Sequence, residues 1–397
     1  MAASLIICLC AGFGYAWSVL QGPIITNHGW PAAQVSLAYT ITVVCSTMTP
    51  LFFAPLIRKL RIRHCIAMGA LCFGGGLILA GYMETVWQLY VFYGLLSGLG
   101  CGFIYPSLMA YVVRLFPDKA GLASGLGTAA YGSGAIIWAP AAVTLINDLS
   151  LDSAFRILGC AFLIVILGSS LLLGEPTSDI EKDTHSSFDG EKHELSSDLC
   201  RSQMVRTPTF YLMVMVFTFA LVAGTIVISQ ASPILRETLN FTSPQAAVFV
   251  SVFAACNMLG RFLWGGLSDR FGIRKVITTV FVLCILSMTM LSFYTKIIVV
   301  VCAMGLAAFC YGGFASVLTP LTALMFGNRY ISENYGVMYV VFGIAGLIGP
   351  ALAVFFKSAN GGSYSGAFFV AALLATAGLI GSCFLKPKVN QGELYEK

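Results

Sequence analysis

The chain has 397 residues, 58% of them hydrophobic and 10% charged, and its mean hydropathy is +0.87. A soluble globular protein of this length carries more surface charge, so the composition excludes that class and predicts a polytopic α-helical membrane protein. The net charge of +5 does not indicate nucleic-acid binding, because the basic residues stand in short loops between apolar segments. The 13 cysteines stand mostly singly inside apolar segments, so neither a metal site nor a disulfide framework is expected. The first apolar segment lacks a charged n-region and a cleavage site, so we expect it to be retained rather than removed as a signal peptide.

Twelve apolar runs of about 20 residues are long enough to cross a bilayer as helices. The predicted spans of the first half are Ala2–Leu20, Ala33–Ile57, Cys65–Met83, Trp87–Val113, Ala120–Ile146 and Ser153–Gly174. Those of the second half are Phe210–Ala231, Pro244–Leu267, Val276–Tyr294, Ile297–Phe326, Asn334–Phe356 and Tyr364–Leu385. The expected fold class is therefore an all-α polytopic protein embedded in a lipid bilayer.

One polar segment, Glu175–Arg206, separates the sixth and seventh spans. It is rich in Ser, Asp, Glu and Lys and poor in aromatic residues, so we expect a flexible linker. The predicted organisation is a six-helix bundle over 1–174, the linker over 175–206, a second bundle over 207–385 and a tail over 386–397. Basic residues concentrate in the loops on the side of the termini, which predicts that both termini and the linker are cytosolic in a multi-pass protein of the cell membrane.

The two halves of the chain repeat weakly. Leu56–Arg63 (LIRKLRIR) matches Leu267–Arg274 (LSDRFGIR) at an offset of 211 residues (267 − 56). The same offset aligns the pair Tyr131-Gly132 with Phe342-Gly343. A six-plus-six repeat around a linker is typical of a transporter built from two pseudo-symmetric six-helix bundles, with its binding site between them.

Closely spaced glycines indicate where helices touch. Gly94, Gly98 and Gly102 lie four residues apart in the fourth span, and Gly121 and Gly125 do so in the fifth. Such spacing allows close backbone approach within a membrane. We therefore predict that these glycines mark helix contacts, which by itself implies no ligand.

Arg261 stands inside the eighth predicted span, whereas the other lysines and arginines lie at span ends or outside them. An arginine in hydrocarbon costs at least about 3 kcal/mol, so its default interpretation is functional. The alternative is an arginine that snorkels to the interface, which lies roughly 12 Å away at Asp269. In a water-filled cavity Arg261 would attract an anion, and its planar guanidinium suits a carboxylate. Asn257 lies one turn earlier on the same face and is expected to orient the guanidinium or to form an interhelical hydrogen bond.

Aromatic residues offer hydroxyl groups and rigid walls for such a site. The candidates are Tyr105, Tyr131 and Tyr311, followed by Tyr15, Trp17 and Tyr339. Each of them can equally be a packing residue. No Asp, Glu or His lies inside a predicted span, which argues against a proton relay of side chains and against a membrane enzyme. We therefore expect no catalytic residue, no cofactor and no bound metal.

The loop after the eighth span combines glycines and charged residues, in the order Gly265, Asp269, Arg270, Gly272, Arg274 and Lys275. It resembles the cytoplasmic gating motif of the major facilitator superfamily. In the first half Arg58 replaces the aspartate of the motif and Arg61 replaces its glycine. The resemblance implies the twelve-helix facilitator fold, with this loop gating the inner face.

Further distinctive stretches are spread along the chain, among them Tyr15-Ala-Trp17-Ser18, Gly98-Leu-Gly100-Cys-Gly102-Phe-Ile-Tyr105-Pro106, Asn257-Met-Leu-Gly260-Arg261, Tyr311-Gly312-Gly313-Phe314 and Asn334-Tyr335-Gly336. In these stretches the chain is similar to one family within that superfamily, the oxalate/formate antiporter family, which is related to monocarboxylate transporters. The resemblance implies that Arg261 binds a substrate carboxylate and that Tyr105, Tyr131 and Tyr311 enclose it. The lysine that the oxalate transporter carries in the eleventh span corresponds to Phe342 here, so the second cation is absent.

The expected function is secondary transport of small carboxylates by alternating access, as monocarboxylate exchange with Arg261 as the anion anchor. Phe342 would suit an apolar substrate tail, although it can also be a packing residue. Two alternatives stay open: a proton-coupled monocarboxylate symporter and a membrane receptor that senses a carboxylate without transporting it. We expect a monomer whose partners are the carboxylate and the bilayer.

Overall fold

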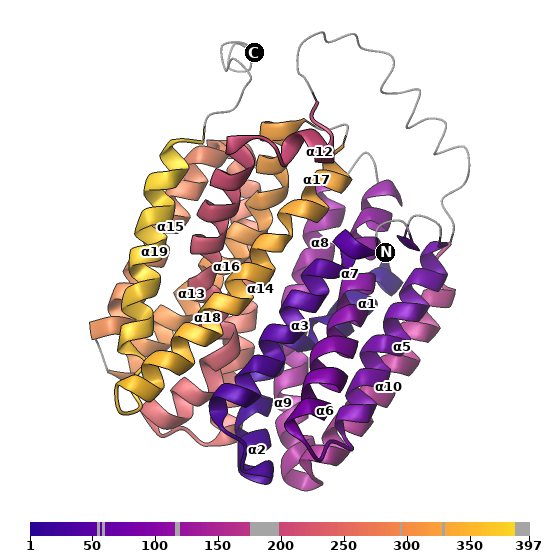
Figure 1. Ribbon diagram of the computed structural model, residues 1–397, viewed down its shortest axis with the longest axis vertical. Coiled ribbons are helices and arrows are strands. Elements are labelled where there is room, and N and C mark those ends of the chain that lie inside the picture. The colour runs from indigo at the N-terminus through magenta and orange to yellow at the C-terminus, as the bar shows by residue number, and fades with distance from the viewer. Residues whose placement is uncertain are drawn as a thin grey trace.

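The computed structural model describes residues 1–53, 56–57, 60–115, 120–174, 198–293, 296–327 and 330–385. Within these residues the regular elements are all helical, and twelve helical segments are long and apolar enough to cross a membrane. The predicted all-α class and all twelve spans are therefore confirmed. Two bundles of six spans stand side by side, the first indigo to magenta and the second red to yellow (Figure 1).

The first bundle contains several interrupted helices. The first span consists of α1 (Ala2–Ala11), η1 (Gly12–Ala16) and α2 (Trp17–His28), and the second and third are α3 (Ala32–Phe52) and α5 (Ile62–Ala80). The fourth consists of α6 (Val86–Leu89), η2 (Tyr90–Ser97) and α7 (Gly98–Leu115). The fifth consists of α8 (Ala120–Gly132) and α9 (Gly134–Asp148), and the sixth is α10 (Leu151–Leu171). Here η1 is a 3₁₀ segment and η2 a π-helical one. The predicted spans one, four and five are thus present, but none is one regular α-helix.

The second bundle is more regular. Its elements are α13 (Pro208–Leu239), α14 (Ser243–Phe271), α15 (Ile273–Phe293), α16 (Ile297–Phe326), α17 (Ile331–Met338) with α18 (Val340–Ala359) in the eleventh span, and α19 (Ser365–Cys383). The first and seventh spans run eight residues past their predicted ends, from Leu20 to His28 and from Ala231 to Leu239. Both extensions contain a proline, Pro23 or Pro233, that the helix accommodates.

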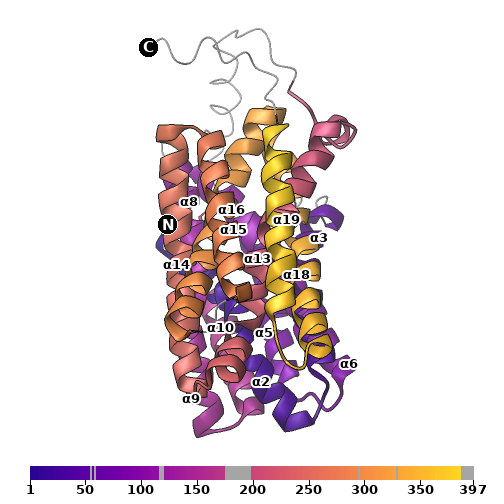
Figure 2. The same cartoon turned by 90° about the vertical axis from the view of Figure 1, so that its left-hand side faces the viewer.

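Contacts within a bundle and between bundles define the architecture. In the first bundle α5 packs on α10 and α7, and in the second α14 packs on α16 and α15 on α19. Between the bundles α3 meets α18, α14 meets α8 and α9, and α2 meets α13. Helices α10 and α19 end at one end of the molecule, which we call the terminal face, and α2 and α9 end at the opposite face (Figures 1 and 2).

The glycine spacing of the fourth span does mark a helix contact. A Cβ on Gly94, Gly98 or Gly102 would meet atoms of α3 at 2.9, 2.7 and 2.4 Å respectively. The same prediction is wrong for Gly125, because no neighbouring atom lies within 4 Å of its Cβ position. The surroundings of Gly121 lie outside the described residues.

Part of the predicted linker packs against the second bundle. Residues 175–197 lie outside the described residues, but α12 (Arg201–Met204) is helical and Met204 is fully buried. The Leu199 amide donates to the Phe326 carbonyl over 3.0 Å, and Asn334 Nδ2 donates to the Leu199 carbonyl over 2.9 Å. Because a buried amide and backbone groups find partners there, the described end of the predicted linker, from Leu199 to Met204, packs against the second bundle rather than being flexible.

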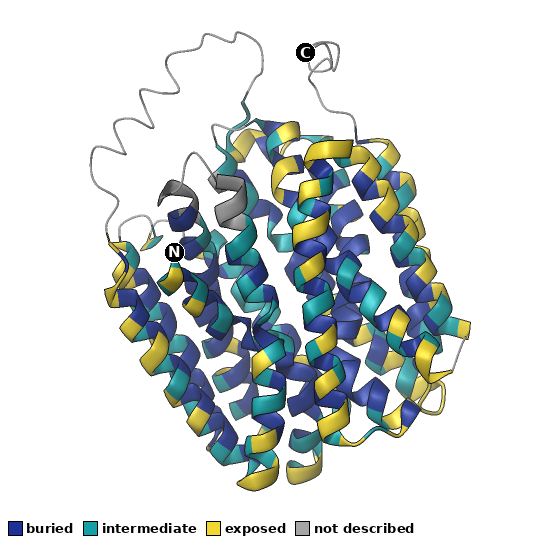
Figure 3. Cartoon of the chain, turned by 180° about the vertical axis from the view of Figure 1, so that it is seen from behind, coloured by how far each residue is buried: buried dark blue, intermediate teal, exposed yellow. Residues whose placement is uncertain are grey.

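The outer surface of the helices is apolar. Large side chains such as Leu71, Ile164, Val248 and Leu373 are 58%, 69%, 56% and 54% exposed. Seen from behind, exposed positions follow the outward faces of the helices while buried positions fill the interior (Figure 3). An apolar exterior of this extent requires lipid rather than water, so the protein is a multi-pass integral membrane protein.

Candidate functional site

Three of the spans that line the interface between the two bundles are irregular near their middle. The first is wound as the 3₁₀ segment η1, the fifth is interrupted at Ser133 and the eleventh at Tyr339. Irregular backbone within a membrane is tolerated where it is buried in protein or lines a cavity, and transporters build binding sites at such breaks. These irregular segments supply Tyr15, Tyr131 and Tyr339, which surround Arg261.

Helix α14 carries Arg261 and is fixed at both ends. Thr242 and Gln245 form a capping box at its start, in which the Thr242 amide donates to Gln245 Oε1 over 2.9 Å. The helix ends at Gly272, whose φ of +87° is a conformation that favours glycine. Arg261 is only 5% exposed, so it faces the interior between the bundles and does not reach an interface.

The guanidinium of Arg261 has two hydrogen-bond acceptors. Its Nε donates to Asn257 Oδ1 over 3.3 Å, and its Nη2 donates to the Tyr15 hydroxyl over 2.9 Å. Arginine has five N–H donors, so three remain without a protein acceptor among the described residues. No carboxylate in the described part of the chain forms an ion pair with Arg261. The site therefore presents a buried positive charge with N–H donors that have no protein acceptor among the described residues, an arrangement suited to binding an anion.

Tyrosine rings form a connected cluster beside the guanidinium. The ring centroids of Tyr15 and Tyr131 are 5.5 Å apart, those of Tyr15 and Tyr311 are 6.5 Å apart, and those of Tyr105 and Tyr131 are 4.4 Å apart. Tyr105 and Tyr311 are buried, and Tyr15 and Tyr131 are half-buried. The contact between Tyr15 and Tyr311 joins rings of the two bundles, so this cluster lies between them.

The eleventh span closes one side of this cluster. Tyr339 stacks on Tyr105 at 5.9 Å, and Phe342 lies 4.9 Å from Tyr339 and 6.1 Å from Tyr311. The offset of 211 residues placed Phe342 opposite Tyr131, but these two rings do not touch and are joined through Tyr339 and Tyr105. The hydrophobic ring of Phe342 thus forms part of the cluster on this side.

Trp17 does not belong to this cluster. It is fully buried in the first bundle, where its ring lies 4.7 Å from Tyr93 and 6.1 Å from Tyr39. Positions two apart on a helix do not share a face, so Tyr15 and Trp17 point to different surroundings. The packing alternative is therefore correct for Trp17.

Residues that sequence reasoning did not assign to the site also line it. The ring of Tyr335 lies 6.0 Å from that of Tyr339, one helical turn away. A Cβ on Gly132 would stand 3.0 Å from Arg261 Nε, and one on Gly312 would overlap the Asn257 carbonyl. Each of these three stands in a Tyr-Gly pair of the sequence, a pattern that could have predicted them. At Gly132 and Gly312 the missing side chain allows the close approach of α14, whereas Gly336 has no such neighbour.

The loop motif after the eighth span lies at the terminal face. Asp269, Arg270 and Lys275 are exposed, and Arg270 lies over the ring of Phe271 at 5.5 Å. Arg274 donates to the Leu385 carbonyl over 3.2 Å, within the second bundle. Gly265, at the start of the motif, has no atom closer than 3.8 Å to its Cβ position.

Side-chain hydrogen bonds join the two bundles in the region that lies between Arg261 and the opposite face. Gln230 Nε2 donates to Gln21 Oε1 and to Ser36 Oγ over 3.2 Å each, and Gln21 Nε2 donates to Ser36 Oγ over 2.8 Å. The three side chains are at most 4% exposed. On the terminal side Gly125 and Gly336 have no neighbouring atom within 4 Å of their Cβ positions. Among the described residues, the bundles are thus joined by hydrogen bonds toward the opposite face.

Comparison with known proteins identifies the class. The family model of the Major Facilitator Superfamily matches residues 2–229 and 214–394, so the chain belongs to this superfamily of transporters. The crystal structure of a D-xylose–proton symporter has the same fold, with a TM-score of 0.73 at 13% identity over 97% of each chain.

Two curated relatives place the chain more narrowly. The oxalate:formate antiporter of Oxalobacter formigenes is 25% identical over 399 residues, which cover 98% of this chain and 91% of that protein. Monocarboxylate transporter 12 of Mus musculus is 24% identical over 364 residues, which cover 84% of this chain and 73% of that protein. The chain is a transporter of the oxalate/formate antiporter and monocarboxylate transporter type, as its motifs predicted, and its relatives are not enzymes.

Proposed function

We propose that the protein exchanges small monocarboxylates across the cell membrane by alternating access, with Arg261 as the anion anchor. The observation that carries this proposal is the buried guanidinium with three spare donors and no acidic partner among the described residues. A buried unpaired charge is strongly unfavourable, so it needs a counter-ion for at least part of the transport cycle. A substrate carboxylate supplies the charge and accepts two parallel hydrogen bonds.

Monocarboxylates are favoured over dicarboxylates because of Phe342. A dicarboxylate would bring a second negative charge next to the rings of Tyr339, Tyr311 and Phe342, where the described residues offer no second cation. Leaving that charge unpaired in a site of low dielectric costs several kcal/mol. An apolar ring in this place is compatible with an uncharged substrate tail.

Exchange is favoured over proton symport because the spans lack acids and histidines near the site. Within the described spans these residues stand near helix ends, as Glu237 and Asp269 do. A proton relay is normally built of such groups inside the membrane. We propose that any accompanying proton travels with the substrate or solvent.

Alternating access assigns roles to the rest of the chain. We propose that 1–174 and 207–385 are the two moving bundles, that 175–206 and 386–397 are cytosolic, and that the loop of Gly265–Lys275 belongs to the inner gate. The terminal face is then the cytosolic one. The Gln21, Ser36 and Gln230 contact would close the outer side of the site in this conformation, and the protein would act as a monomer.

Uptake into proteoliposomes tests the proposal. Vesicles loaded with unlabelled lactate are diluted into labelled lactate, and transient accumulation of label is expected because exchange needs substrate on both sides. Binding of lactate without accumulation would instead support a receptor. Accumulation driven by a proton gradient, without stimulation by internal substrate, would support the symporter.

A further inference from the structure

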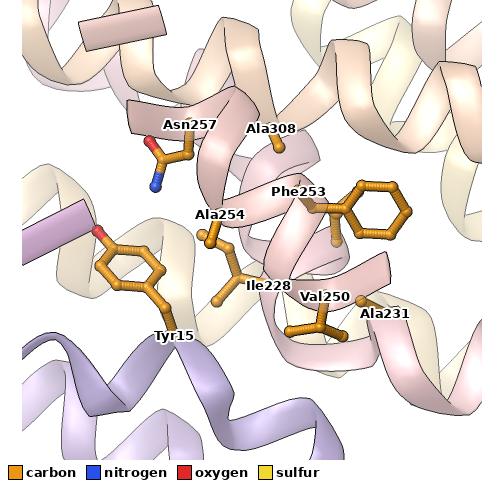
Figure 4. A pocket seen from close by; sticks show the side chains of 9 residues that line it. Tyr15, Ile228, Ala231, Val250, Phe253, Ala254, Asn257 and Ala308 are labelled. Atoms are coloured by element: carbon orange, nitrogen blue, oxygen red, sulfur yellow. The ribbon is translucent and has the colours of Figure 1, made fainter. Parts of the chain in front are cut away.

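A cavity opens at the terminal face, on the side of the second bundle that is turned away from the first. It lies between the start of α15 and the ends of α16 and α19 and encloses about 200 Å³. Helices α15 and α19 pack on other helices of the second bundle and stand at its outer edge (Figures 1 and 2). By contrast, the cavity between the bundles beside Tyr15 and Asn257 encloses only about 20 Å³, and its other walls are apolar (Figure 4). Because one water molecule needs roughly 10–15 Å³, only the cavity at the terminal face, of these two, has room for a larger group.

The rim of the cavity at the terminal face is positively charged. Arg274 lies in the first turn of α15, and its Nη2 donates to the Leu385 carbonyl over 3.2 Å. The other N–H groups of its guanidinium have no acceptor among the described residues. Arg270 and Lys275 are exposed on the same loop, and Asp269, the one acid between positions 269 and 275, forms no ion pair with Arg274 in the described part of the chain. The positive end of the α15 dipole adds to this charge, so the rim is suited to an anion.

The walls behind this rim are mostly apolar. Ile277 lies one turn beyond Arg274 on α15, and Leu321 lines the cavity from α16. Arg274, Thr278 and Val282 follow one another at intervals of four residues, so they share one face of α15. Val282 is 50% exposed and belongs to the apolar exterior that faces lipid. The face of α15 that begins with the charge of Arg274 therefore continues as a surface in contact with lipid.

We propose that this cavity binds one anionic phospholipid from the leaflet at the terminal face, with the phosphate at Arg274 and an acyl chain along Ile277 and Val282. The surplus of cations at the rim favours a lipid with a net negative charge over a zwitterionic lipid. The apolar walls and their continuation along α15 favour a lipid over a soluble anion, which would leave them uncovered. The cavity lies away from the interface between the bundles, so this proposal does not depend on which substrate is transported.

Native mass spectrometry of the purified full chain tests the proposal. The protein is mixed with equal amounts of dioleoylphosphatidylglycerol and dioleoylphosphatidylcholine, which have the same acyl chains and differ in headgroup charge. We expect one bound phosphatidylglycerol molecule with about a fivefold preference over phosphatidylcholine, the effect of one basic residue at an anionic membrane surface. A preference near one would overturn the proposal. Excess glycerol 3-phosphate carries a phosphate without acyl chains and should leave the lipid bound, whereas displacement would show that the cavity binds a soluble anion and that the proposal is wrong.

Two neighbouring cations separate a specific site from general attraction to a basic surface. Arg274→Gln should lower the preference to about one, because Arg274 lines the cavity. Lys275→Gln removes the same charge from the same loop but from a residue outside the cavity lining, so most of the preference should remain. An equal loss in the two variants would show that the basic surface attracts anionic lipid without a specific site, which contradicts the proposal.

A matched pair of phenylalanine substitutions tests the cavity itself. Thr278→Phe fills the cavity and keeps every charge, so the bound phosphatidylglycerol should be lost. Thr279→Phe places the same ring at the next position, which does not line the cavity, and should leave lipid binding unchanged. Both threonines are exposed, so we expect both variants to fold. Phosphatidylglycerol binding that survives Thr278→Phe would show that the lipid does not enter the cavity and would overturn the proposal.

Discussion

Replacement of Arg261 by glutamine should abolish transport, and the structure sets the size of the effect. Three N–H donors of the guanidinium are free for a ligand, and two of them form a bidentate pair with a carboxylate. Each charge-assisted hydrogen bond contributes about 1.5–3 kcal/mol. Loss of two amounts to about 3–6 kcal/mol, or about 10²- to 10⁴-fold in affinity. Arg261→Lys keeps the charge but cannot form the bidentate pair with a carboxylate, so we expect about a 10- to 100-fold loss of affinity.

The same substitution should leave the substrate-free protein at least as stable. Arg261 has no acidic partner among the described residues, so Arg261→Gln removes a buried charge that only neutral groups solvate. Ligand should stabilise the native protein by about 2.7 kcal/mol at a concentration 100 times its Kd. The glutamine variant should show no such stabilisation.

Two measurements on purified protein check this prediction. One is exchange of labelled lactate in proteoliposomes below saturation, and the other is thermal unfolding with and without lactate. Arg156→Gln is the matched control, because Arg156 bonds only within its own bundle, to the Asp152 carbonyl and to Ser153. Exchange in the Arg261→Gln variant close to that of the control would show that Arg261 is structural and that the reasoning is wrong.

Three further predictions concern selectivity, gating and topology. Phe342→Lys supplies a second cation, so oxalate should compete better with labelled lactate in this variant than in the native protein. If oxalate competes better than unlabelled lactate already in the native protein, the argument that the site holds only one cation is wrong. Gln230→Leu removes two hydrogen bonds between the bundles, about 1–3 kcal/mol together, so spin labels on the two bundles at the opposite face should move apart. An unchanged distance distribution would show that the contact of Gln230 with Gln21 and Ser36 does not hold the bundles together. Hydrogen bonds from Ser202 Oγ and the Gln203 amide lower the pKa of Cys200, so more thiolate is present at neutral pH than in an ordinary cysteine. An impermeant maleimide should therefore label Cys200 only from the cytosolic side, and more slowly as the pH falls. Fast labelling on intact cells would reverse the topology.

The spans and the position of an arginine within one of them could be predicted because they depend on local properties. A run of about 20 apolar residues must be helical in lipid, where each backbone group needs an internal partner. A charge within such a run is recognisable wherever the chain folds, and Asn257 shares its face by helical spacing alone. The first and seventh spans run eight residues past their predicted ends, across Pro23 and Pro233, which the helices accommodate.

The partner of Arg261 could not be predicted in this way. Tyr15 and Trp17 are two residues apart, so only one can face α14, and the choice depends on the rotation of the first span at η1. That rotation is fixed by tertiary packing: a Cβ on Gly12 would overlap the Tyr131 carbonyl and would stand 3.0 Å from the Gly134 Cα. The sequence around Gly12 does not predict this contact.

By itself, the sequence therefore determined the class of the protein, its twelve spans and the position of the intramembrane arginine that we propose as the anion anchor, because hydrophobic length and an isolated charge act wherever the chain lies. Only the tertiary structure decided which aromatic rings reach Arg261, that Asn257 Nδ2 is left without an acceptor, and that Gln21 and Gln230, 209 residues apart, meet between the bundles. These features arise where distant helices meet, and the contacts of one helix with another depend on rotations and breaks that no short stretch of sequence specifies.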